Sequence, residues 1–121
     1  MQNVNHINCK ICTYGDTLYL QGLAVRDEML RKPLGLSFSN LDLKEEANHH
    51  FLVAFNDAMV VGTSQWYWTD NEVIRVKQVS VLSEYQSIGV GRLMNEFIEQ
   101  WCENNQVKTV ELHARKVAYG F

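Results

Sequence analysis

The sequence lacks several features that mark particular classes of protein. It contains no apolar run of the roughly 18 residues that a membrane-spanning helix needs, so we expect no membrane partner. Residues 1–6 show no basic region followed by an apolar stretch, so we expect no secretory signal. The net charge is -3 and no basic block occurs, which argues against a nucleic-acid partner. The only proline is Pro33, and no linker or repeat divides residues 1–121, so we expect a single domain.

Cysteine is also scarce. The three cysteines, Cys9, Cys12 and Cys102, are an odd number without framework spacing, which is typical of a protein of the reducing cytoplasm. Cys9 and Cys12 form a Cys-x-x-Cys pair, but no second pair follows to complete a metal site. The pair lies in a strand-like run and not at a helix start, where a redox motif would lie. We therefore interpret both as ordinary strand cysteines and expect no metal.

The apolar fraction of 46% is sufficient for a core, and the apolar spacing predicts a mixed α/β fold. Tight turns at 56–57 and 69–71 make the three central strands antiparallel, and a strand–helix–strand unit at 72–113 predicts a parallel crossover. The helix from residue 90 carries an apolar stripe of Leu93, Phe97 and Trp101, which we expect in the core. The predicted strands are 6–13, 51–55, 59–68, 72–81 and 107–113, and the predicted helices are 17–31, with Asp16 as cap, one from Val90 to Asn104, and one that begins in 114–121.

The segment Gln86-Ser87-Ile88-Gly89-Val90-Gly91 joins a predicted strand to this amphipathic helix. Glycines at a helix start let the backbone approach a ligand, and the unpaired N–H groups there bind phosphate. A P-loop would place Gly-Lys-Ser/Thr at its end, whereas Gly91 is followed by Arg92. A dinucleotide fold would have a third glycine at Met94 and a strand order without the preceding hairpins. Both patterns fail, and the third interpretation to consider is an acyl-coenzyme A loop.

The loop resembles the central motif of the GNAT superfamily of N-acetyltransferases, Gln/Arg-x-x-Gly-x-Gly/Ala after a strand that ends in valine. Gln86, Gly89 and Gly91 fill the three marked positions, and Val79 and Val81 fill the strand end. Three further segments are similar to the corresponding parts of a bacterial branch of that superfamily. They are residues 26–36, residues 60–63, and Leu112–Arg115 followed by Ala118.

The resemblance implies an enzyme that transfers acetyl from acetyl-coenzyme A to a primary amine, which attacks the thioester directly. It implies that the backbone of Val79, Ser80 and Val81 binds the pantetheine arm and polarises the thioester carbonyl. The pyrophosphate would be held by main-chain N–H groups of residues 86–92, namely Gln86, Ser87, Ile88, Gly89, Val90, Gly91 and Arg92. The acceptor is a small-molecule or peptide amine that the sequence does not identify.

The sequence offers fewer candidates for the proton-transfer roles than for cofactor binding. We take His50, from the pair His49–His50 before a strand, as a candidate base, and Gln78 as a group that orients the substrate. His113 is a further candidate on the cleft. Glu72 and Glu111 are more typical of exposed partners for Arg75, Lys77 or Lys108, and Trp66, Tyr67 and Trp68 are expected to pack on the sheet.

The family often takes its general acid from a tyrosine that would directly follow Phe121. The resemblance thus implies a C-terminally shortened domain without the usual last helix and two strands. Strand 107–113 would then be an exposed apolar edge, from which we predict a homodimer. The alternative function is a coenzyme A-binding module without turnover, acting as a sensor or interaction protein.

Overall fold

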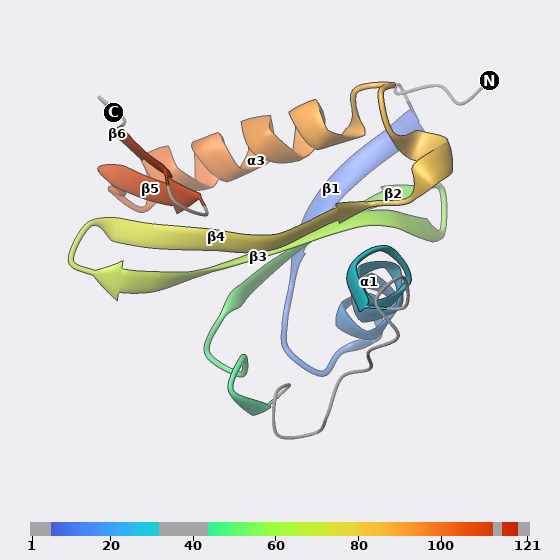
Figure 1. The fold of residues 1–121 in the computed structure, drawn as a ribbon, viewed down its shortest axis with the longest axis horizontal. Coiled ribbons are helices and arrows are strands. Elements are labelled where there is room, and N and C mark those ends of the chain that lie inside the picture. The colour runs from blue at the N-terminus through green and yellow to red at the C-terminus, as the bar shows by residue number, and fades with distance from the viewer. Residues whose placement is uncertain (1–5, 32–43, 113–114, 119–121) are drawn as a thin grey trace.

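The structure, a computed structural model, describes residues 6–31, 44–112 and 115–118. Its centre is one six-stranded sheet in which the strands lie in chain order (Figure 1). Every pair of neighbours is antiparallel except β4 and β5, which are parallel. The β2–β3 and β3–β4 hairpins and the parallel β4–β5 crossover are as the sequence predicts. The strands are β1 (Ile7–Cys12), β2 (His50–Asn56), β3 (Met59–Asp70), β4 (Val73–Val81), β5 (Thr109–Leu112) and β6 (Arg115–Ala118).

Two helices cover opposite faces of this sheet (Figure 1): α1 (Thr17–Arg26) and α3 (Val90–Asn104). The alternation of side chains along β2 separates two apolar clusters, because successive residues of a strand point to opposite faces. Phe51 and Val53 lie with α1, and Leu52 and Ala54 lie with α3. The predicted stripe of α3 packs against its cluster from the rim, whereas the fully covered positions are Val90, Met94, Ile98 and Cys102.

Helix α1 begins where the sequence predicts, at an aspartate cap. The Asp16 carboxylate accepts hydrogen bonds from the backbone N–H groups of Tyr19 (2.8 Å) and Thr13 (2.9 Å). The predicted helix to Arg31 is α-helical only as far as Arg26, and a π-helical turn, Asp27–Arg31, continues it. The Asp16 side chain thus connects the start of α1 to Thr13, and the Arg26 side chain connects its other end to Glu46 and Gln65.

We expect Asp16→Ala to lower the free energy of unfolding at pH 7 by about 1 kcal/mol, the usual cost of a lost N-cap. The bonds from Tyr19 and Thr13 hold the pKa of Asp16 below its ordinary value. A depressed folded-state pKa gives stability that is present above the unfolded pKa and is lost as the pH falls through the folded pKa. Urea unfolding from pH 7 to pH 3 should show the wild-type advantage shrink in acid, and Asp16→Asn should keep most of the cap at both pH values.

The end of the chain differs from the prediction of a helix within 114–121. Residues Arg115–Ala118 form β6, which pairs with β5 in the register Thr109 to Ala118 and Leu112 to Arg115. The outer edge of β5 presents unpaired backbone N–H and C=O groups, and a returning strand satisfies them at the expense of local helix propensity. The predicted exposed edge at 107–113 is therefore wrong, because β6 covers it, and the free edges of the described sheet are β1 and β6.

Candidate functional site

The ladder between β4 and β5 ends half-way along β4. Their parallel pairing runs only from Val73 opposite Thr109 to Val76 opposite Leu112. β4 continues to Val81, so residues 77–81 have no ladder partner on the β5 side within the described chain. A strand edge of this kind offers backbone donors and acceptors to an extended ligand.

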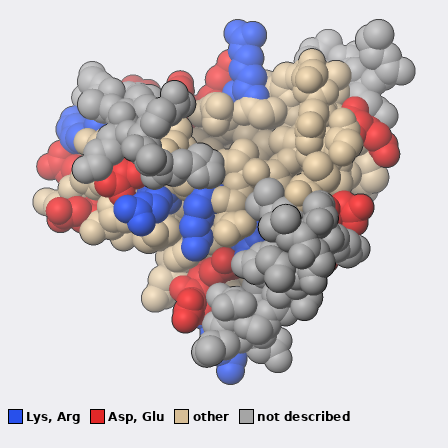
Figure 2. All heavy atoms as spheres, viewed as in Figure 1, with Lys and Arg blue, Asp and Glu red and all other residues tan. Residues whose placement is uncertain are grey.

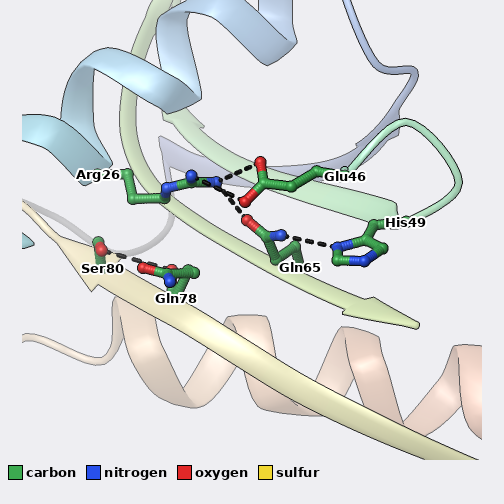
Figure 3. Close-up of polar contacts among 6 residues, drawn as sticks. All are labelled: Arg26, Glu46, His49, Gln65, Gln78 and Ser80. Atoms are coloured by element: carbon green, nitrogen blue, oxygen red, sulfur yellow. Dashed lines mark hydrogen bonds and ion pairs between the residues drawn. The ribbon is translucent and has the colours of Figure 1, made fainter. Parts of the chain in front are cut away.

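A β-bulge lies at the start of this open segment. On the β3 side, Lys77 is opposite Gln65 and Ser80 is opposite Thr63, so both Gln78 and Val79 face the single residue between them. Gln78 has a φ of 57°, and the Val79 side chain is 47% exposed. The Ser80 hydroxyl donates to the Gln78 carbonyl oxygen at 3.4 Å (Figure 3). Bulges of this kind re-aim the backbone, often beside functional sites.

The predicted glycine loop follows β4 directly and leads into α3. The side-chain amide nitrogen of Gln86 (Nε2) donates to the Val81 carbonyl oxygen at 2.9 Å, which holds the loop against the end of the strand. Ser87 and Gly89 have φ values of 68° and 102°, and Gly89 is the N-cap of α3. The first bond to the cap joins Leu93 N–H to Gly89 C=O (3.0 Å), so the amides of residues 90–92 have no acceptor inside the helix. These amides and the helix dipole favour an anion at this point.

Gly91 has no packing reason to be glycine. A Cβ built at this position meets nothing within 4 Å, and the residue lies in the first turn of α3. Glycine within a helix costs roughly 0.5–1 kcal/mol relative to alanine. Its neighbour Arg92 is exposed and forms an i,i+4 ion pair with Glu96 (3.3 Å). Gly91 thus lowers helix stability without relieving a clash. A ligand that lies close to the backbone would explain why this position has no side chain.

The two predicted catalytic residues are not brought together. Gln78 lies at the bulge, beside the open edge of β4. His50 lies on the face that α3 covers, where its ring centroid is 6.1 Å from that of Trp66 and 4.9 Å from that of Trp101. Burial lowers the pKa of His50. His113 lies outside the described residues.

Sequence reasoning missed a buried polar network on the α1 face. Figure 3 shows Arg26 bonded to Glu46 and to Gln65 of β3, and Gln65 bonded in turn to His49. These residues come from α1, the segment before β2, and β3, so no local pattern links them. On the outer part of the same sheet, Arg75 pairs with Glu111 at 3.1 Å, as the sequence predicts.

Among the described residues, no group of three or more histidine, cysteine, aspartate or glutamate side chains could hold a metal ion. No helix in that part of the chain is long and apolar enough to cross a membrane. On the face shown in Figure 2, lysine and arginine side chains are interspersed with acidic ones and do not form one basic patch. The open edge of β4 and the start of α3 are thus the features that suit a ligand, one with an extended arm and an anionic end.

The family model for GNAT acetyltransferases matches residues 26–121, a range that contains both of these features. The chain belongs to the GNAT acetyltransferase family. A search of curated proteins found no match. The family assignment confirms the resemblance on which the acyl-coenzyme A interpretation of the glycine loop was based.

Solved GNAT structures share this fold. A putative N-acetyltransferase from Lactobacillus plantarum has a TM-score of 0.76 at 17% identity, over 92% of this chain and 77% of that one. An aminoglycoside acetyltransferase from an uncultured soil sample, solved with sisomicin, has a TM-score of 0.76 at 15% identity, over 92% and 79%. A GNAT acetyltransferase from Elizabethkingia anophelis, solved with acetyl-coenzyme A bound, has a TM-score of 0.66 at 16% identity, over 89% and 65%. At such identities the likeness shows the fold alone.

Proposed function

We propose that this GNAT protein transfers the acetyl group of acetyl-coenzyme A to a primary amine by direct attack of the amine on the thioester. One observation carries the proposal: the unpaired edge of β4 runs directly into a glycine loop at the start of α3. In this arrangement the backbone of Val79, Ser80 and Val81 binds the pantetheine arm. The amides of residues 86–92 bind the pyrophosphate at the positive end of the α3 dipole.

The bulge is the proposed position of the reacting carbonyl. A backbone N–H that the bulge turns out of the ladder can donate to the thioester oxygen as negative charge develops on it during attack. The amine nitrogen bonds to the carbonyl carbon and gives up a proton, the carbon–sulfur bond breaks, and the departing thiolate takes up a proton, so that an amide and a free thiol result. Gln78 at the bulge is the proposed orienting residue. We assign His50 a packing role, because its two tryptophan neighbours lie on the face that α3 covers.

The acceptor class is proposed from the family to which the chain belongs, and its path of entry from the site. We propose a small-molecule or peptide amine that enters from the α1 face beside the bulge, where polar side chains converge (Figure 3). We also propose a cytoplasmic homodimer, now through the free edge of β1 or β6 and not through β5. A monodisperse monomer in sedimentation velocity would contradict the dimer.

Two measurements on the wild-type chain test the proposed function. We expect calorimetry to show saturable binding of acetyl-coenzyme A, and a thiol-release assay to show turnover with some members of a panel of primary amines. Release must depend on the amine, which separates transfer from hydrolysis of the thioester. Binding without amine-dependent release would favour a coenzyme A-binding module, and absence of binding would contradict both functions.

A further inference from the structure

The network beside the bulge begins with a buried ion pair. Arg26 and Glu46 are 3% and 6% exposed, and two nitrogens of the guanidinium each donate to one carboxylate oxygen, at 3.0 and 2.9 Å. The same guanidinium also donates to the side-chain oxygen of Gln65, which is 1% exposed. Planar, bidentate pairing of this kind fixes the orientation of the guanidinium.

The direction of each hydrogen bond, from donor to acceptor, then fixes the orientation of the Gln65 amide and the position of the proton on His49. An arginine side chain only donates, so the Gln65 oxygen must face Arg26 and the Gln65 NH2 must face the other way. The Gln65 Nε2 atom lies 2.9 Å from Nδ1 of His49, and an amide NH2 only donates (Figure 3). Nδ1 of His49 is therefore an acceptor without a proton, and the neutral ring carries its proton on Nε2.

The other surroundings of His49 favour the same neutral form. Its pKa is lowered by burial first, and then by the positive charges of Lys77 on β4 and Arg26 on α1 and by the neighbouring His50, whereas only Glu46 opposes these effects. The ring stacks on Tyr67 of β3, with centroids 4.5 Å apart and planes 13° from parallel. A second proton would also set two N–H groups against each other at Gln65.

The position of His49 places it on the acceptor side of the proposed site. Gln65 is opposite Lys77, the residue just before the bulge, so the network lies beside the point on β4 at which the described ladder with β5 has ended. The glycine loop lies at the opposite end of this open segment of β4. His49 is half-buried, and within the described part of the chain its Nε2 atom has no hydrogen-bond partner. A positioned N–H without an acceptor is suited to a ligand oxygen.

We propose that Arg26, Glu46 and Gln65 lock His49 as the Nε2–H tautomer, and that this N–H binds an oxygen atom of the acceptor and is not the base for its amine. The preferred acceptor then carries a carbonyl, carboxylate or hydroxyl oxygen near the amine. The lock is a property of the protein alone, whereas the acceptor contact rests on the proposed function. His49 would act as a specificity-determining residue.

The lock is tested by imidazole nitrogen NMR on the free protein. We expect the wild-type spectrum at pH 7 to show His49 neutral, with the proton on Nε2. In Gln65→Glu the side chain becomes an acceptor for both Arg26 and His49, so the His49 pKa should rise by about one unit or more. His50, which the network does not contact in this way, is the internal reference and should not shift by a comparable amount.

Two NMR results would overturn the lock. One is a wild-type His49 that is protonated, or that carries its proton on Nδ1, at pH 7. The other is an unchanged His49 pKa in a Gln65→Glu protein whose circular dichroism and amide spectrum show that it is folded. Both readouts need no cofactor and no acceptor, so they remain informative if the proposed transferase activity is absent.

The acceptor contact is tested by kinetics with amines that the thiol-release panel identifies. His49→Phe keeps a ring to stack on Tyr67 but removes the donor, and we expect KM for an oxygen-bearing acceptor to rise by roughly tenfold, the effect of one hydrogen bond. The pH profile of kcat should keep its shape, and His49→Gln should recover part of the affinity. A loss of kcat of about 100-fold or more with loss of one limb of the profile would identify His49 as the base and contradict the proposal.

Discussion

Replacing Gly91 with glutamate is expected to stabilise the free protein and to abolish its binding of acetyl-coenzyme A. The substitution relieves the cost of glycine in the first turn of α3, where a Cβ meets no other atom. It also places a negative charge at the positive end of the helix dipole. Together these effects should raise the free energy of unfolding by about 1 kcal/mol.

The same carboxylate would repel a pyrophosphate at the helix start. Like charges about 4 Å apart at a protein surface cost roughly 4 kcal/mol, so affinity should fall by nearly three orders of magnitude, about 700-fold. Gly91→Ala is the matched control, because it gives a similar gain in stability and tests steric exclusion alone. Urea unfolding and calorimetry measure the two quantities. If Gly91→Glu binds acetyl-coenzyme A as wild type does, the pyrophosphate does not lie at this helix start.

Replacing Arg26 with methionine is expected to cost about 3–5 kcal/mol of unfolding free energy. Within the part of the chain that the structure describes, the guanidinium provides both hydrogen bonds that the Glu46 carboxylate receives, and both side chains are almost fully buried. Removing it leaves a buried carboxylate without a donor, which costs far more than the intact pair contributes. Gln65 also loses the partner that orients its amide.

The double variant Arg26→Met/Glu46→Leu is the control for this prediction. Replacing both members of a buried pair with apolar groups is often nearly neutral, so we expect it to recover most of the loss. Urea unfolding of the two variants gives the comparison. A single variant that loses less than about 1 kcal/mol would show that the carboxylate reaches solvent, and the network would then not be rigid enough to orient His49.

Features of the fold that depend on nearby residues could be predicted from the sequence, whereas features that depend on a distant segment could not. The hairpins, the crossover and α3 follow from periodicity and turn residues within short windows, and the structure has them. The C-terminal prediction failed because pairing with β5 decided the conformation of Arg115–Ala118. The local propensity of residues 115–118 does not show that another segment, β5, offers an unpaired edge for them to pair with.

The candidate site also combines features that could be predicted from the sequence with features that could not. The glycine loop is a contiguous motif at a strand–helix junction, so its position at the start of α3 could be predicted from residues 79–92 alone. The bulge at Gln78 and Val79 could not, because a shift of register depends on which β3 residues stand opposite. The prediction that His50 is the catalytic base did not anticipate its tryptophan neighbours, which only the sheet and α3 bring together.

By itself, the sequence determined the family, the central hairpins with the parallel crossover, and the glycine loop at the start of α3. These depend on residue type and spacing over short stretches, where covalent geometry limits the possible structures. Only the tertiary structure decided which polar residues meet beside the bulge of β4. Arg26, Glu46, Gln65 and His49 lie up to 39 residues apart along their hydrogen bonds, and they meet because α1 packs on one face of β3. Their chemistry, a donor chain with a fixed direction, exists only once that packing is formed.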